Sequence, residues 1–216
     1  MSTNPVDVDT AFLGKYQESI NEVFRIYYED INPFIVQFEI LKNEFPIEIQ
    51  NEIRAIYGHL VRASIADNDA DVQRNIEKMR SHTKRALFDC FKYSCILISD
   101  KYSDFFERYR GIDLTYINKG HFIHDIQQKY RQATKQLQAA KELELSNASE
   151  DQLVAEYQRA YELFADIEDQ LNKAESDAAF LKHRATRRDV LAIASFIIGA
   201  AGFLYTVLST APSFIK

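Results

Sequence analysis

The side chains best suited to chemistry are histidines, arginines and an aspartate in two neighbouring segments of the chain. In the second segment, His82, Arg85 and Asp89 follow one another at spacings of three and four. Side chains at these spacings are neighbours on a helix, so the three residues share one face. Apolar residues flank them, and charged groups beside a core are costly unless they are paired. We therefore predict an ion pair between Asp89 and either Arg85 or Arg62.

The first segment, NEIRAIYGHLVRA, contains Arg54, His59 and Arg62. His59 and Arg62 are three residues apart and share a helix face, whereas Arg54 and His59 are five apart and point in different directions. This arrangement favours a structural or ligand-sensing set over a catalytic pair. Guanidinium groups bind anions strongly, so Arg62, His82 and Arg85 are the candidate binding surface for an anionic ligand.

Other reactive residue types do not form a recognisable site. His121 and His124 stand near the start of a predicted helix, and an exposed helix N-terminus explains them better than a metal site. Cys90 and Cys95 are five apart, which suits neither a zinc pair nor a local disulfide, so we expect reduced core residues. The sequence contains no glycine-rich phosphate loop, HExxH or Gly-x-Ser-x-Gly motif. We predict no metal, no cofactor and no enzyme activity.

The elements that carry these residues are predicted to be helices. Glycine and proline are scarce, at six and four of 216 residues, and apolar residues recur at the helical period. The predicted helices cover residues 10–42 with a kink or break at Pro33, 46–66, about 71–108, about 119–144 and 150–209. No segment alternates as a strand does, so the predicted fold class is all-α. The predicted divisions are a disordered segment 1–9, a bundle 10–149, a connecting helix 150–189, a transmembrane helix 190–209 and a short external tail 210–216.

Residues 10–145 resemble the HEPN superfamily, helical bundles that are common in prokaryotic conflict systems. The matching residues are RAIYGH, in which Arg54 is followed after four residues by His59, and the segment NIEKMRSHTKRALFDCFKY, which looks like the facing helix. In HEPN ribonucleases this histidine and arginine meet their symmetry mates across a dimer and cleave RNA without a metal. The resemblance implies that His59 would be the acid–base group and Arg54 the phosphate stabiliser. The residue after the arginine is commonly polar in active members, and here it is Ala55.

One segment is incompatible with a water-exposed surface. Residues 190–208 contain no acidic or basic side chain, although 27% of the residues of the whole chain are charged. The net charge of the chain is −6, which argues against a broad nucleic-acid-binding surface. At about 1.5 Å per residue this segment covers roughly 28 Å, close to the hydrocarbon thickness of a bilayer. Basic residues precede it at Lys182, Arg184, Arg187 and Arg188. The positive-inside rule then predicts a single-pass membrane protein with residues 1–189 in the cytoplasm.

Ser149 is the predicted N-cap of the last predicted helix. This helix carries one apolar row at alternating steps of four and three, which is the 3.5-residue repeat of packed helices. Its first members are Leu153, Tyr157, Ala160, Phe164, Ile167, Leu171, Ala174, Ala178, Leu181 and Ala185. The row continues through Arg188, Ala192, Ser195, Gly199, Gly202, Thr206 and Ser209. We call this row the seam.

We expect the seam to pack within its own domain over residues 150–178 and against other chains near the membrane. Its members beyond Arg188 are all small, and small residues at four-residue spacing let membrane helices approach closely. A ring of such helices would enclose an aqueous path, with the seam hydroxyls facing it and Arg188 biasing it toward anions. The alternative is that Arg188 contacts lipid headgroups and that the hydroxyls bond to their own backbone.

A HEPN-like bundle followed by one membrane span and a small-residue seam resembles membrane effectors of bacterial antiviral systems, such as CRISPR-associated HEPN membrane pores and Hailong-type effectors. That resemblance implies a homo-oligomer in the bilayer, opened by a nucleotide or oligonucleotide signal or by a partner protein of the defence system. Opening would depolarise the inner membrane and halt the infected cell. The two alternatives are a membrane-tethered HEPN ribonuclease and a non-conducting tail-anchored scaffold.

Overall fold

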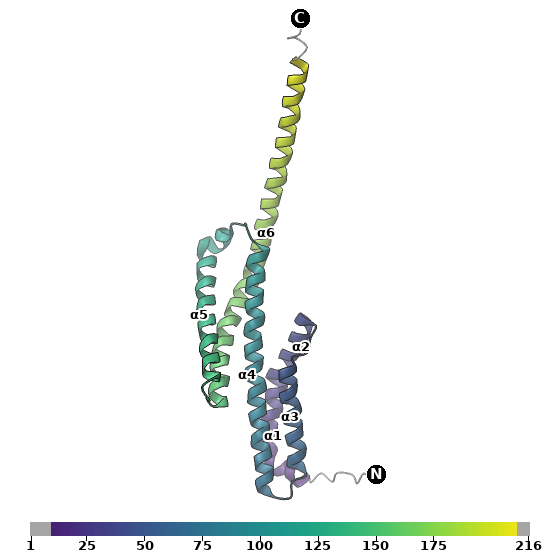
Figure 1. Ribbon diagram of the computed structural model, residues 1–216, viewed down its shortest axis with the longest axis vertical. Helices are drawn as coiled ribbons and strands as arrows, with labels where there is room; N and C mark the ends of the chain where they lie inside the picture. The colour runs from purple at the N-terminus through teal and green to yellow at the C-terminus, as the bar shows by residue number, and fades with distance from the viewer. Residues whose placement is uncertain (1–9, 211–216) are drawn as a thin grey trace, which may run out of the picture. The chain divides into compact units, whose positions relative to one another are not determined.

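The computed structural model describes residues 10–210, and every regular element in that range is a helix (Figure 1). The predicted all-α fold class is therefore confirmed. The elements are α1 (Thr10–Ile26), a π-helical turn η1 (Tyr27–Ile31), α2 (Asn32–Lys42), α3 (Ile47–Ser64), α4 (Asp69–Arg108), a 3₁₀ segment η2 (Leu114–Gly120), α5 (His121–Glu144) and α6 (Glu150–Thr210). The predicted disordered segment 1–9, and all but the first residue of the predicted tail 210–216, lie outside the described range.

Pro33 accounts for the irregular turn between α1 and α2. Proline has no backbone N–H, and its ring collides with the carbonyl four residues earlier, so regular α-helical bonding cannot continue through it. The backbone widens instead, and the N–H of Asn32 donates to the carbonyl of Tyr27, five residues back. The predicted break at Pro33 thus takes the form of a π-helical turn rather than a gap between two helices.

The chain folds into two compact units that draw on the same long helices. Unit 1 comprises Met1–Lys101 and Lys129–Ile167, and unit 2 comprises Tyr102–Gln128 and Glu168–Lys216. This grouping differs from the predicted division into a bundle 10–149 and a connecting helix 150–189. The difference arises because the first part of α6 shares its core with α4 and α5.

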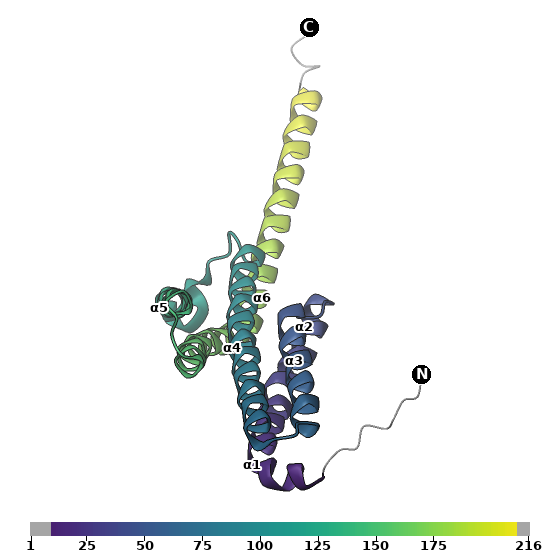
Figure 2. The same ribbon diagram turned by 60° about the horizontal axis from the view of Figure 1, so that its bottom comes forward.

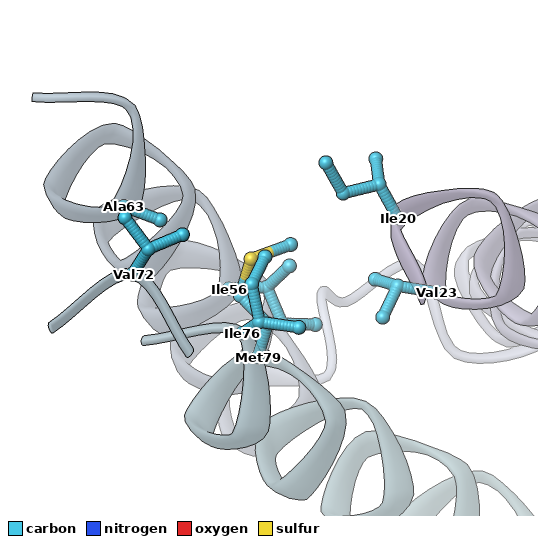
Figure 3. Close-up of a cluster of buried hydrophobic side chains, with 7 residues drawn as sticks. All are labelled: Ile20, Val23, Ile56, Ala63, Val72, Ile76 and Met79. Atoms are coloured by element: carbon cyan, nitrogen blue, oxygen red, sulfur yellow. The ribbon is translucent and has the colours of Figure 1, made fainter. Parts of the chain in front are cut away.

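In the first half of unit 1, α1 and α3 pack on the N-terminal part of α4 (Figures 1 and 2). Lys15 pairs with Asp69 and Glu22 with Arg80, so α1 and α4 run in the same direction. Figure 3 shows Ile20 and Val23 of α1 pointing toward side chains of α3 and α4. The buried apolar cluster consists of Ile20, Val23, Ile56, Ala63, Val72, Ile76 and Met79.

In the second half of unit 1, α4, α5 and the start of α6 share another core. Phe88 stacks on Tyr157 and Phe91 on Tyr161, with ring centroids 5.8 and 5.4 Å apart, so α4 and α6 are parallel. Two contacts show that α5 and α6 are antiparallel: Gln136 bonds Glu156, and Lys129 pairs with Asp166. A step back along α5 is thus a step forward along α6. Every seam member that α6 contributes to unit 1 is buried, namely Leu153, Tyr157, Ala160, Phe164 and Ile167.

The start of α6 is set by a local motif. The Ser149 hydroxyl accepts a bond from the N–H of Gln152, at 3.4 Å, and the Gln152 side chain accepts one from the N–H of Ser149, at 3.0 Å. This reciprocal capping box satisfies donors that a helix end otherwise leaves free. The predicted N-cap at Ser149 is confirmed.

Unit 2 is formed by the end of α4, by η2, by the first turns of α5 and by α6 from Glu168 onward. Phe105 packs against Phe122 and Tyr109, with ring centroids 5.8 and 4.9 Å apart. The seam members Leu171, Ala174 and Ala178 are buried as well. The prediction that the seam packs inside the chain over residues 150–178 is confirmed.

Candidate functional site

Two histidines from α3 and α4 stack on each other inside unit 1. The ring centroids of His59 and His82 are 5.2 Å apart, and the rings are nearly parallel at 21°. Nδ1 of His59 lies 2.9 Å from Oδ1 of Asn75, and Nδ1 of His82 lies 2.6 Å from a carboxylate oxygen of Glu52. Helices α3 and α4 are antiparallel, and each histidine bonds a residue of the other helix: His59 bonds Asn75, and His82 bonds Glu52. The two stacked rings lie between these two bonds.

The hydrogen bonds determine which nitrogen of His59 carries the proton. The Asn75 amide nitrogen donates to the main-chain carbonyl of Asp71 at 2.8 Å, so its oxygen faces His59 and accepts from Nδ1. The other ring nitrogen, Nε2, is left with a lone pair. His59 is only 9% exposed, and this burial lowers the pKa of its imidazole. The hydrogen bond with Asn75 opposes that shift, whereas the positive charges of Arg62 and Lys78 add to it. His59 is therefore neutral at physiological pH.

The predicted ion pair between Asp89 and Arg85 or Arg62 is wrong. Arg85 binds Glu150 at the start of α6, with Nε 3.0 Å from the carboxylate. Asp89 binds Lys92, one turn further along α4, at 3.3 Å. The physical reason is that α6 brings a second carboxylate to Arg85, and Asp89 has a cation on its own helix face. Burial raises the pKa of Asp89, and the neighbouring ammonium of Lys92 opposes that rise.

The predicted surface of Arg62, His82 and Arg85 is divided in the structure. Arg62 lies beside the part of α4 that holds Asn75, and Arg85 lies beyond His82 in the other direction. The step from residue 75 to residue 85 is about 15 Å along the helix axis, which separates the two arginines. Arg62 is exposed, with no ion pair among residues 14–206, and its guanidinium covers Gly58 at 3.4 Å from a Cβ built there. The basic side chains near His59 are therefore Arg62, Lys78 and His82, but not Arg85.

Arg54 lies on a different face of α3 from His59. Its side chain is exposed, whereas His59 is turned into the bundle. Tyr57, Val61 and Ile65 continue the same exposed side at four-residue spacing, and each exposes at least 50% of its surface. This apolar stripe was not predicted from the sequence. The available signal was that a second row, Ile53, Ile56 and Ala63, already supplies the buried face.

The remaining predicted reactive residues occupy ordinary positions. His121 and His124 are both exposed in the first turn of α5. Cys90 and Cys95 are free thiols in the core, which confirms their predicted place. Burial raises the pKa of both thiols, to about 12 for Cys95. Such thiols react slowly at neutral pH.

The seam changes character along α6. Leu181 and Ala185 are half-buried, and from Arg188 to Thr206 every seam residue is exposed. Among the helices of residues 10–210, α6 alone is long and apolar enough to cross a membrane, and none of its most apolar window is buried. A Cβ built on Gly199 or Gly202 would meet nothing within 4 Å. The small-residue half of the seam is therefore open in the single chain.

The polar members of this half differ in their hydrogen bonding. The Thr206 hydroxyl donates to the carbonyl of Gly202 at 2.9 Å, which matches the alternative in which a hydroxyl bonds to its own backbone. Ser195 makes no such bond within the described part of α6. Arg188 is 85% exposed and lies 3.9 Å from Asp189. The side chain of Ser209 lies outside the described residues.

No family model, no curated protein and no solved structure matches this chain. The resemblance of residues 10–145 to HEPN bundles remains a prediction.

Proposed function

We propose that this chain is a membrane effector of a bacterial antiviral system, which assembles through α6 into an ion-conducting pore and depolarises the inner membrane when triggered. The observation that carries the proposal is that one seam is used in two ways. Over residues 153–178 it is buried inside the chain, and from Arg188 onward it is exposed and lined by small side chains.

The difference between the two halves of the seam supports packing against other copies. The buried half contains Tyr157, Phe164 and Leu171, whose bulk fills space between helices. The exposed half contains Ser195, Gly199 and Gly202, which would leave space unless another backbone came close. Small residues of this kind are typical of helix contacts in membranes. Each chain has a single candidate span in the described range, so the neighbour comes from another copy.

The orientation follows from charge. Lys182, Arg184 and Arg187 lie just before the apolar part of α6, and basic residues are retained on the cytoplasmic side. Both units then lie mainly in the cytoplasm, where a signal made during infection reaches them. Within the assembly, Ser195 offers a hydroxyl toward the axis, and Arg188 stands at the cytoplasmic entrance, where it favours anions.

The trigger in this proposal is anionic. Arg62 and Lys78 place cationic groups beside the two stacked histidines, at one end of the α3–α4 pair. Phosphate groups of a nucleotide or oligonucleotide fit such a set because charge-assisted bonds are strong. To switch nearly all copies, the trigger must bind the open state more tightly by roughly 5 kcal/mol.

The geometry favours this proposal over a ribonuclease. A metal-free cleavage site of the HEPN type needs its arginine and histidine together at one accessible surface. Here Arg54 is exposed on one face of α3, while His59 points into the bundle and stacks on His82.

The test is the membrane potential of cells that express the chain. We expect the wild-type chain to depolarise cells that carry a voltage-sensitive dye. The Gly199→Leu/Gly202→Leu variant should lose most or all of this depolarisation. Two leucines on the seam separate the helices that must touch. The matched control is Ala200→Leu/Ala201→Leu, which adds the same side chains on the other side of α6 and should depolarise like wild type.

Full depolarisation by the Gly199→Leu/Gly202→Leu variant would overturn the pore. The same assay separates the alternatives. His59→Ala should abolish toxicity in a tethered ribonuclease, and RNA cleavage should survive removal of the span. A passive scaffold would leave the potential unchanged in every variant.

A further inference from the structure

One end of unit 2 is fixed against α6 by polar contacts. Arg108 and Tyr109, at the end of α4, both bind Glu175 of α6, at 2.7 and 2.9 Å. Further along α6, Lys182 donates to the main-chain carbonyl of Arg108 at 3.0 Å. This bond satisfies a carbonyl that the helix end would otherwise leave without a partner. The end of α4 is thereby held at the level of Lys182.

The distance from this level to the apolar part of α6 is short. Residues 182–190 cover about 12 Å along the helix axis. The headgroup layer occupies roughly 5–7 Å on each side of the hydrocarbon core of a bilayer. The segment 109–120 connects α4 to α5 at the end of unit 2 nearest the apolar part of α6 (Figures 1 and 2). A bilayer that α6 spans would have its headgroups within reach of long side chains at this end of unit 2.

The segment carries the side chains that suit a membrane surface. Tyr116 is 75% exposed, and tyrosine is enriched where hydrocarbon meets water. Lys119 is exposed and has no ion pair within the described range. Arg110 is exposed as well, and its partner Glu107 lies on the same turn. On α6, Arg184 adds a further exposed cation next to this level. Each lysine or arginine near an anionic leaflet contributes ~1 kcal/mol of attraction.

The same segment has a defined shape. Asp113 caps η2: its carboxylate accepts bonds from the N–H and the hydroxyl of Thr115, at 3.1 and 2.5 Å. Asn118 and Lys119 have φ values of 47° and 54°, in the left-handed region that few residues other than glycine adopt. A segment that is already shaped loses little conformational freedom when it binds.

We propose that residues 109–120 form a second membrane contact, in which Tyr116 and Lys119 bind the headgroups of anionic phospholipids. The contact fixes unit 2 against the cytoplasmic face of the bilayer. It rests on the proposed insertion of α6, but it does not depend on the pore.

The contact is tested by labelling the full chain in vesicles. Tyr116→Cys is labelled with a fluorescent maleimide, and the protein is reconstituted in phosphatidylcholine with or without phosphatidylglycerol. Cys90 and Cys95 are buried with raised pKa values, so the label goes to the introduced thiol. A headgroup spin label then quenches fluorophores that touch the surface. The matched control is Asp177→Cys, an exposed site of the same unit about 20 Å before residue 190 along α6.

We expect strong quenching at position 116 with phosphatidylglycerol, and little quenching at position 177. The double variant Arg110→Gln/Lys119→Gln should make the label at position 116 touch the headgroups less often. The ratio of labels in contact with the surface to labels away from it should fall by about fivefold for each charge removed, which is ~1 kcal/mol each. Equal quenching at the two positions, or no dependence on phosphatidylglycerol, overturns the contact while α6 stays inserted. If carbonate extracts the chain from the vesicles, insertion itself is wrong, and both proposals fall.

Discussion

At the scale of single residues, His59 is the side chain whose surroundings matter most. It is almost fully buried, it donates through Nδ1 to Asn75, and it stacks on His82. Two positive side chains, Arg62 and Lys78, lie close enough to oppose its protonation. An imidazole in this position is held neutral, and protonation would place a charge in a buried site among cations.

We predict that acid destabilises the chain through His59. Its pKa is lowered from the ordinary value of 6.5, so the unfolded chain binds this proton more tightly than the folded chain. The free energy of unfolding therefore falls as pH drops below about 6.5. Urea unfolding followed by circular dichroism at pH 7.5 and 5.5 should show a smaller difference in His59→Gln than in wild type.

His121→Gln is the matched control for this measurement, because His121 is exposed on α5. It should keep the wild-type pH dependence. Identical pH dependence in wild type and His59→Gln would contradict the prediction.

At the scale of elements, α6 matters most, because one helix serves two environments. Its repeat keeps the same helix face toward its neighbours along the whole length. In the first part α4 and α5 supply those neighbours, and in the last part the described chain supplies none. The change is marked by side-chain size, from Phe164 and Leu171 to Gly199 and Gly202.

We predict that enlarging a seam alanine destabilises the fold. Ala178 is fully buried, so Ala178→Leu inserts atoms into filled space and should lower the free energy of unfolding by about 1–3 kcal/mol. The adjacent Ala179 is exposed, and Ala179→Leu should leave stability nearly unchanged. The midpoint of denaturant unfolding measures both. Equal midpoints for the two variants would mean that the seam does not pack at residue 178.

At the scale of the whole molecule, the assembly in the membrane is the central question. The long helices α4, α5 and α6 each contribute residues to both units. The proposed pore needs several copies of α6 to meet along the exposed half of the seam. A disulfide across such a meeting point requires Cα atoms within about 7 Å, which makes it a sensitive probe of contact.

We predict that Ser195→Cys forms covalent dimers in membranes under mild oxidation. Ile197→Cys lies on the opposite side of α6 and should remain monomeric on a non-reducing gel. The buried Cys90 and Cys95 leave the introduced thiol as the reactive one. Crosslinking at residue 197 in place of residue 195 would show that copies meet through another face of α6.

The sequence predicted most of the fold. Helix positions, the cap at Ser149, the irregular turn at Pro33 and the buried seam over residues 153–178 all depend on local periodicity and on residue type. These are properties of short stretches, so the amino-acid order reveals them directly. The apolar run from residue 190 is of the same kind, because its length and composition alone make it long enough for a bilayer.

Only the tertiary structure decided which polar groups meet. From the sequence alone, several carboxylates were possible partners of Arg85. In the structure it binds Glu150 of α6, which is 65 residues away in the chain. His82 binds Glu52, His59 binds Asn75, and Arg62 is separated from Arg85 by the antiparallel course of α3 and α4. The cause is that side-chain pairing depends on how distant helices are placed against one another. Periodicity determines which face of a helix is buried, but not which partner that face meets.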